Sequence, residues 1–264
     1  MKLASFFKGR IRKLFLCRRV FIDMALRQFK EKYAGSKLGL WWAVVTPLLF
    51  AASINFVFIS VFNIQMPNYT LFVLAGIIPW FFFTNSLSEA AGSFLSNSSI
   101  LRQTLVPREF IPMASVMASL LNFAMGLVFL LPFFIIANIK VLALIPLLSA
   151  VILFHLVFIT GFALLLSVLN VFVKDLPHIL STLFMVWFWV TPVFYSIDMA
   201  PASFLWVCFI NPMTHFVVIY REILFQAKFP PLGDFFILGL LSLGFFLISY
   251  LIFISKEPDL LKRI

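Results

Sequence analysis

The sequence predicts an all-α integral membrane protein with six transmembrane helices. Of its 264 residues, 63% are hydrophobic and only 11% are charged, whereas a soluble domain usually carries about 25% charged residues. Several continuously apolar runs each approach the ~20 residues that a helix needs to cross a bilayer. The strands of a membrane barrel would instead alternate apolar and polar residues. Because lipid offers no partner for backbone polar groups, these runs indicate a bundle of helices.

Residues 1–37 predict the first element, a cytoplasmic amphipathic helix. Phe and Leu recur there at spacings of three and four, and Lys and Arg cover the remaining positions. Such a helix lies in the interface plane of a membrane rather than crossing it; a solvated basic tail is the alternative. Eleven of the 20 Lys and Arg lie in this segment. Their position beside an apolar run favours attraction to anionic lipids and argues against nucleic-acid binding.

A six-helix transmembrane domain is expected at residues 38–254, and its charges orient it. Six spans put both ends of the chain on the same side. With the N-terminus inside, the inner segments hold 17 Lys and Arg and the outer loops hold three. The positive-inside rule therefore places both termini, including a tail at 255–264, in the cytoplasm. The spans are predicted at residues 38–62, 70–92, 112–137, 142–172, 178–197 and 234–254.

The segment 198–233, between spans five and six, has a pattern of its own. The stretch FLWVCFI (Phe204–Ile210) is apolar but too short to span, and Asn211-Pro212 breaks it. An amphipathic stretch follows at Met213–Phe225. Two short helices with a break predict a re-entrant outer gate, which is possible at membrane depth only where protein or a water cavity covers it. A plain surface loop with two amphipathic pieces is the alternative.

The sequence contains no motif for catalysis, for nucleotide binding or for a metal. The three histidines, His155, His178 and His215, are far apart. His155 lies in mid-span, where a neutral, hydrogen-bonded histidine is favoured over an ionised functional one. The interior of the spans holds one acidic residue, Glu89, which is a poor basis for proton-driven transport. Energy for transport is therefore expected from another chain.

One stretch, KYAGSKLGLWWAVVTPLLF (Lys32–Phe50), resembles the start of the membrane subunit of type 2 ATP-binding-cassette (ABC) exporters. It is most similar to the permeases that export O-antigen, capsular polysaccharide and teichoic acid. The likeness extends in order over residues 24–255. Further stretches similar to that family are Leu71–Phe83, Ser99–Pro112, Val171–Tyr195 and Ile210–Phe225.

This resemblance implies a channel-forming subunit of an ATP-driven exporter that moves a lipid-linked polysaccharide across the bacterial inner membrane. It implies a homodimer of this chain with two copies of a separate ABC ATPase. The chain would then be a transport subunit and no enzyme, without a cofactor of its own, while the ATPase binds ATP and Mg. The cargo would be a polyprenyl-linked glycan. Two alternatives remain: an exporter of a drug or small lipid on the same fold, and a non-transporting membrane scaffold.

A stripe of aromatic and hydroxyl side chains in span five is the first group of candidate residues. These residues recur at i, i+3, i+4, i+7 and i+11, which is one face of a helix. Aromatic rings stack on the apolar faces of sugars, and such weak contacts suit a polymer that slides. For the tryptophans at the start of span one, anchoring at the membrane interface is the alternative. The predicted channel residues are Trp41, Trp42, Phe56, Phe184, Trp187, Phe188, Thr191 and Tyr195.

Three basic residues before span one are candidates for a site that holds the lipid pyrophosphate at the entrance. Arg27, Lys30 and Lys32 lie near the end of the predicted amphipathic helix, and phosphate groups are bound by Arg and Lys. The alternative is that they anchor the helix to anionic lipids.

The inner loop at 93–111 is the candidate contact with the ATPase. It is polar and then basic, and Arg102, Arg108 and Glu109 are its candidate coupling residues. An ordinary inner loop that obeys the positive-inside rule is the alternative. The last group, the outer gate, consists of Asn211, Pro212 and His215.

Overall fold

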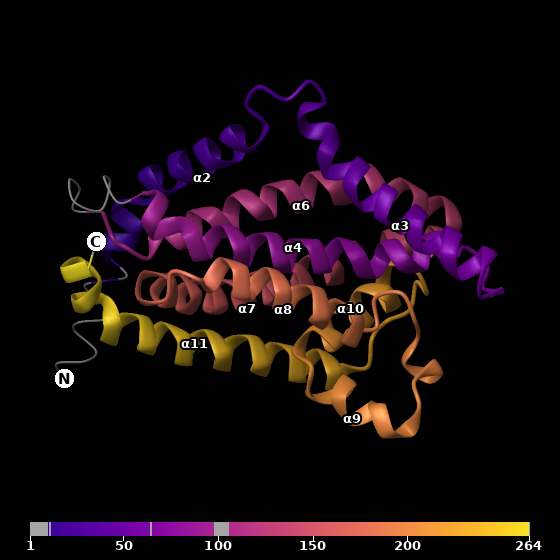
Figure 1. The fold of residues 1–264 in the computed structure, drawn as a ribbon. Coiled ribbons are helices and arrows are strands. Elements are labelled where there is room, and N and C mark those ends of the chain that lie inside the picture. Colours follow the sequence, from indigo (N-terminus) through magenta and orange to yellow (C-terminus); the bar gives the residue numbers. More distant parts are fainter. Residues whose placement is uncertain (1–9, 11, 64, 98–105, 264) are drawn as a thin grey trace.

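The computed structural model describes residues 10, 12–63, 65–97 and 106–263, and the regular elements within these residues are all helical (Figure 1). The all-α prediction is confirmed for this part of the chain. The α-helices are α2 (Arg18–Tyr33), α3 (Trp42–Ser60), α4 (Tyr69–Ser96), α6 (Phe110–Ala137), α7 (Ile145–Phe172), α8 (Leu176–Val190), α9 (Ala202–Ile210), α10 (Pro212–Leu224) and α11 (Leu232–Arg263). Short 3₁₀ turns are η1 (Gly39–Trp41), η2 (Ile139–Leu144) and η3 (Ile197–Met199).

Five helical segments in the described part of the chain are long and apolar enough to cross a membrane. The helix α4 lies at the centre of the bundle. Its apolar stretch is 72% buried, whereas the apolar stretches of the other four segments are 17–28% buried. The long helices α4, α6, α7 and α11 run side by side (Figure 1). The five segments are Gly39–Ser60, Tyr69–Ser96, Phe110–Ala137, Ile139–Phe172 and Leu232–Leu260.

The fifth predicted span differs from the structure. The helix α8 has 15 residues and ends at Val190, so the prediction of one continuous span over 178–197 is wrong. Thr191 has an extended backbone with ψ of 134°. The cause is Pro192, because the ring of a proline drives the preceding residue out of the helical region. Span five is therefore a short helix followed by an unwound segment.

The two short helices predicted within 198–233 are present as α9 and α10. They meet at Asn211 and are bent by 95° relative to each other. Counted as one broken span, this pair raises the number of candidate spans in the described residues to six. The re-entrant course of the pair stays a prediction.

Both ends of the described chain lie at the same end of the bundle. Arg10 is hydrogen-bonded to Glu257 of α11, and α9 lies at the opposite end (Figure 1). This agrees with an even number of crossings, and the side of the membrane stays a prediction. The predicted tail at 255–264 continues α11 as helix up to Arg263.

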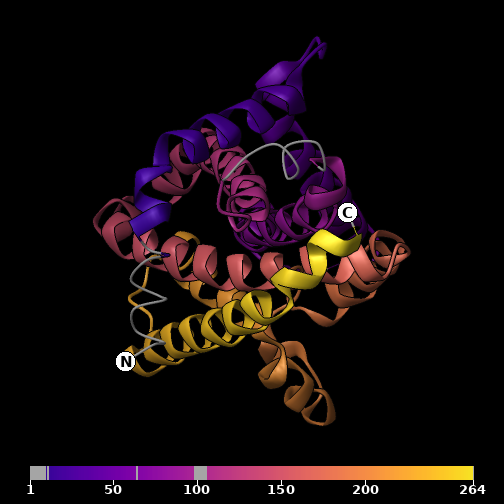
Figure 2. The ribbon, with the colours of Figure 1, turned by 90° about the vertical axis from the view of Figure 1, so that its left-hand side faces the viewer.

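The helix α2 packs along α6, with Ala25 buried and Phe21 in contact with the Phe110 ring at 5.1 Å between centroids. In the end-on view of Figure 2, α2 and α3 lie along one edge of the bundle and α9 projects from the opposite edge. The placement of α2 in the membrane interface stays a prediction.

Candidate functional site

A cavity of about 800 Å³, lined by charged, hydroxyl and apolar groups, lies between α2 and α4, and Ser115 of α6 also lines it. Two of the three predicted head-group residues, Arg27 and Lys32, line this cavity, whereas the third, Lys30, is exposed outside it. On the α4 side, its lining includes small residues such as Gly92 and Ser93. A methyl group added at Gly92 would have nothing within 4 Å.

Both basic residues of this cavity are already paired with carboxylates. Lys32 Nζ lies 2.6 Å from Glu89 Oε1, and Ser119 Oγ donates to Glu89 Oε2 at 2.7 Å. Arg27 Nε lies 2.7 Å from Glu31 Oε1, one helical turn away. The hydrogen bond and the charge of Glu31 raise the pKa of Arg27 above its usual value. Glu89, which sequence reasoning noted only as an isolated acid, is therefore the counter-charge of Lys32.

A smaller cavity of about 220 Å³ adjoins the first, since Lys32 lines both. Its lining includes Tyr33, whose hydroxyl donates to Asn122 Oδ1, and the rings of Trp42 and Phe81. The structure thus brings a predicted channel residue, Trp42, next to a predicted entrance residue. Two further predicted channel residues on α3 or just before it, Trp41 and Phe56, are exposed.

The aromatic stripe of α8 faces the inside of the protomer. The rings of Phe184 and Phe188 are buried against α4, at 5.9 Å from Phe83 and 5.8 Å from Trp80, respectively. Thr191 and Tyr195 follow the end of α8, so the premise that the five residues share one helix face is wrong. Trp187 and Tyr195 are half-buried and Thr191 is buried. The exposed face of α8 instead carries Leu183, Val186 and Trp189.

Asn211 joins the predicted outer gate to this stripe. Its Oδ1 accepts from Trp187 Nε1 at 2.8 Å and from the backbone N–H of Met213 at 3.0 Å. Its Nδ2 donates to Thr191 Oγ1 at 2.9 Å. Asn211 is therefore the N-cap of α10, with Pro212 at the first helical position, where a missing N–H has no cost. One amide side chain fixes both the break between α9 and α10 and the unwound end of α8.

Arg221 of α10 is a buried residue that sequence reasoning counted only as an outer-loop charge. Its Nη2 donates to the carbonyls of Pro192 and Val193 at 2.8 and 2.9 Å, and its Nη1 donates to that of Tyr195 at 3.3 Å. The guanidinium carbon lies 3.6 Å from the centre of the Phe72 ring. The signal in the sequence was an arginine within an apolar stretch, because a buried charge needs partners.

His215, the remaining gate candidate, is half-buried on α10. Its Nε2 lies 2.9 Å from the carbonyl oxygen of Phe209 in α9. This contact spans the break between the two helices, beside Asn211. The three predicted gate residues therefore lie together at the same break.

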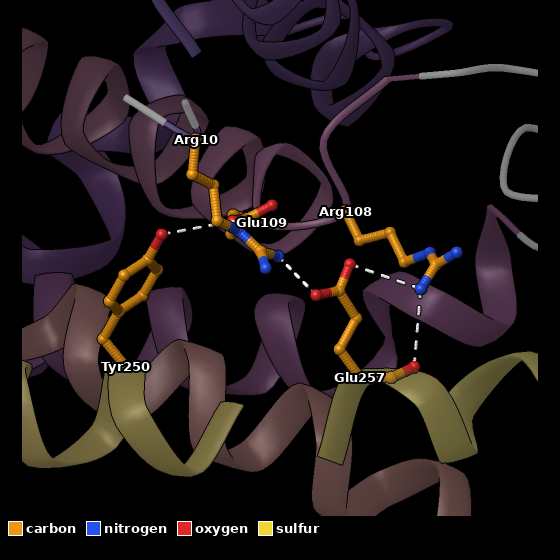
Figure 3. A network of polar contacts seen from close by, with 5 residues as sticks. All are labelled: Arg10, Arg108, Glu109, Tyr250 and Glu257. Atoms are coloured by element: carbon orange, nitrogen blue, oxygen red, sulfur yellow. Dashed lines mark hydrogen bonds and ion pairs between the residues drawn. The ribbon is translucent and has the colours of Figure 1, made fainter. Parts of the chain in front are cut away.

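At the opposite end of the bundle, five charged or polar side chains form a network (Figure 3). Arg10 binds both Glu109 and Glu257, and Arg108 Nη1 lies 3.2 Å from Glu257 Oε1. Tyr250 Oη donates to Glu109 Oε1 at 3.3 Å. Burial lowers the pKa of Arg10, but its hydrogen bonds to the two carboxylates outweigh this, so that the pKa stands above its usual value.

Two of the three predicted coupling residues, Arg108 and Glu109, belong to this network. The side chain of Glu109 is 0% exposed, so its carboxylate points into the protein toward α11 and Arg10. The side chain of Arg108 is 24% exposed and remains accessible from outside. Arg102 lies outside the described residues. Sequence reasoning missed Arg10 and Glu257, because residues almost 250 positions apart share no local pattern.

Comparisons with known proteins agree with the resemblance of the sequence. A membrane-protein family described as "ABC-2 type transporter" matches residues 20–225 of this chain. Two proteins of Klebsiella pneumoniae, described as "O-antigen export system permease protein RfbA", are 32% and 33% identical over 203 and 201 residues, about three quarters of each chain. A protein of Myxococcus xanthus with the same description is 26% identical over 258 residues, which is 96% of this chain and 98% of the relative.

Proposed function

Because this chain belongs to the ABC-2 type transporter family of membrane proteins, we propose that it is the channel-forming subunit of an exporter of lipid-linked polysaccharide. The observation that carries this proposal is the similarity to three permeases named for O-antigen export, one of them over nearly the whole chain. The cargo in this proposal is a polyprenyl-linked glycan of the O-antigen, capsule or teichoic-acid type. The membrane is the inner membrane of a bacterium.

The proposed exporter contains two copies of this chain and two copies of an ABC ATPase, which binds ATP and Mg. The helix α3 supports the pairing of two copies, because only 17% of its apolar stretch is buried within one protomer. The rings of Trp41, Trp42 and Phe56 are exposed on this side of the molecule. With the exposed face of α8 and its Trp189, they offer a path of weak stacking contacts for sugar rings.

The charged residues at the two ends take separate roles in this proposal. Lys30 and Arg27, exposed on α2, meet the pyrophosphate of the lipid carrier. Arg108, together with Arg102 of the predicted inner loop, contacts the ATPase. At the other end, the break at Asn211 is the outer gate that opens as the glycan leaves.

The proposal is tested with the purified complex of this chain and its ATPase in lipid nanodiscs. The rate of ATP hydrolysis is measured with and without a polyprenyl-linked glycan extracted from the host. We expect stimulation by the glycan lipid and none by the bare polyprenyl phosphate. If no ATPase co-purifies with this chain, the proposal that it belongs to an ATP-driven exporter is wrong. If lipophilic drugs stimulate ATP hydrolysis and the glycan lipid does not, the alternative of a drug exporter is favoured.

A further inference from the structure

The cavity between α2 and α4 has a charge balance that does not suit an anion. Its lining holds two cations, Arg27 and Lys32, and three carboxylates, Asp23, Glu31 and Glu89. Each cation already lies within 2.7 Å of a carboxylate oxygen. A phosphate group that entered would have to displace a carboxylate from its partner and would then face three negative charges at close range. The pyrophosphate therefore stays at the exposed surface of α2, near Lys30.

The rest of the lining is neutral, with hydroxyl and amide groups beside the apolar side chains of Val20 and Met24. Four serines take part, Ser88, Ser93, Ser96 and Ser115, together with Gln28 and Asn97. The Oγ of Ser93 is buried and has no hydrogen-bond partner among the described residues. Hydroxyl, amide and carboxylate groups supply both donors and acceptors, which is the set that a ligand with many hydroxyl groups can satisfy.

The adjoining small cavity adds flat apolar surfaces. Trp42, Tyr33 and Phe81 line it, and the Lys32–Glu89 pair lies where the two cavities meet. The larger cavity, at about 800 Å³, is in the range of known ligand sites, about 300–1,000 Å³. A space lined by hydroxyl, charged and apolar groups next to aromatic rings matches the two faces of a sugar, its hydroxyl edge and its apolar ring face.

We infer that the α2–α4 cavity binds the neutral sugar residues that adjoin the pyrophosphate of the cargo lipid. This inference rests on the proposed function and assigns the sugar, rather than the pyrophosphate, to this cavity. Lys32 and Glu89 then act as a neutral pair that hydrogen-bonds hydroxyl groups. The charged head group lies outside the cavity, on the exposed surface of α2 near Lys30.

Filling the cavity tests the inference, and the chain offers a matched control. Gly92 lines the cavity, so leucine there should fill part of it; at Gly244 of α11, which does not line the cavity, a methyl group likewise meets no atom within 4 Å. In the complex with the ATPase, Gly92→Leu should raise the glycan-lipid concentration for half-maximal stimulation by about tenfold or more, equivalent to ~1.4 kcal/mol. Gly92→Ala should give a smaller increase, and Gly244→Leu none. An unchanged half-maximal concentration in Gly92→Leu would overturn the inference while leaving the proposed function intact.

A labelling experiment separates the sugar from the pyrophosphate. Ser88→Cys is introduced into the complex after Cys17→Ser and Cys208→Ala, and its reaction with N-ethylmaleimide is followed. Polyprenyl-diphosphate-linked glycan should protect the new thiol several-fold, whereas polyprenyl diphosphate without the glycan should not. Equal protection by both lipids would make the cavity an anion site, and protection by neither would exclude it as a ligand site; either result contradicts the inference. If the wild-type complex shows no stimulation by the glycan lipid, the proposed function fails, and the labelling still decides whether the cavity binds sugar.

Discussion

Arg221 is a charged residue that is only 4% exposed, in the packed end of the bundle where α9 and α10 lie. Three carbonyls released by the end of α8 accept hydrogen bonds from it, and the Phe72 ring covers it. Such carbonyls would otherwise be buried without a donor, which costs about 1–3 kcal/mol for each group. Arg221 therefore makes the unwound segment after Val190 possible.

Replacing Arg221 should destabilise the protein more than replacing an exposed cation nearby. We expect Arg221→Leu to lower the stability by several kcal/mol, because three buried carbonyls lose their donor at about 1–3 kcal/mol each. The measurement is the thermal midpoint of the purified protein in detergent. Lys228→Leu, at an exposed position four residues after the end of α10, is the control and should leave the midpoint nearly unchanged. Similar midpoints for the two variants would mean that the guanidinium does not hold the segment.

At the other end, Arg10 and Glu257 should be energetically coupled through their direct contact. Their side chains are only 14% and 18% exposed, so solvent screens them less than a surface pair. We expect the effects of Arg10→Ala and Glu257→Ala on the free energy of unfolding to be non-additive, with a coupling energy of about 0.5–3 kcal/mol in a double-mutant cycle. The measurement is resistance to unfolding by sodium dodecyl sulfate. A cycle of Arg10→Ala with Lys140→Ala, which lies outside the network, should be additive.

At the scale of elements, the central helix α4 approaches the unwound segment after α8 more closely than a side chain permits. A methyl group added at Gly76 would lie 2.9 Å from the carbonyl oxygen of Val193 and 3.3 Å from Arg221 Nη2. Small residues are what allow such close contact between membrane helices. This one glycine therefore decides how near α4 can lie to the segment that Arg221 holds.

We expect Gly76→Ala to lower the stability by about 1–3 kcal/mol through overpacking, because the first atom that it meets is backbone. The control is Gly244→Ala, where no atom lies within 4 Å and the added methyl group meets open space. Thermal midpoints of both purified variants measure the difference. Equal stability of the two variants would show that the segment at Val193 moves freely away from α4.

The orientation of α8 gives a second prediction for an element. Its buried face holds Phe184 and Phe188, and its exposed face holds Trp189. If the exposed face lines the glycan path, Trp189→Leu should slow export several-fold while the complex with the ATPase still assembles. Trp206→Leu, which changes an equally exposed tryptophan on α9, is the control for loss of surface apolar area. Equal export by both variants would exclude the exposed face of α8 from the path.

At the scale of the whole molecule, the distribution of charge predicts which end of the bundle faces the cytoplasm. The end with Arg10, Arg108 and Glu257 is expected inside, and the end with α9 and α10 outside. In intact cells, after removal of Cys17 and Cys208, Lys228→Cys should react with a membrane-impermeant maleimide and Lys256→Cys should not. Permeabilised cells provide the control, since both thiols should then react. The reverse pattern in intact cells would invert the topology.

The sequence by itself determined the class of the protein and much of its outline. Continuous apolar runs left only helices as a way to pair backbone groups in lipid, and they placed the starts of most long helices within a few residues. The break at Asn211 was predictable too, because an asparagine followed by proline both ends one helix and caps the next. The similarity of local stretches to a known family gave the transporter class, which the comparisons support.

The tertiary structure alone decided which faces are buried and which charges meet. A helical stripe such as that of α8 has the same pattern whether it faces its own core or a channel, so only packing against α4 placed Phe184 and Phe188 inside. Pro192 ends α8 after Val190, but the carbonyls that this leaves unpaired depend on a donor, Arg221, supplied from another helix. The pairs Lys32–Glu89 and Arg10–Glu257 join residues distant in the chain. Such contacts arise from the folded arrangement of helices, and no local periodicity encodes them.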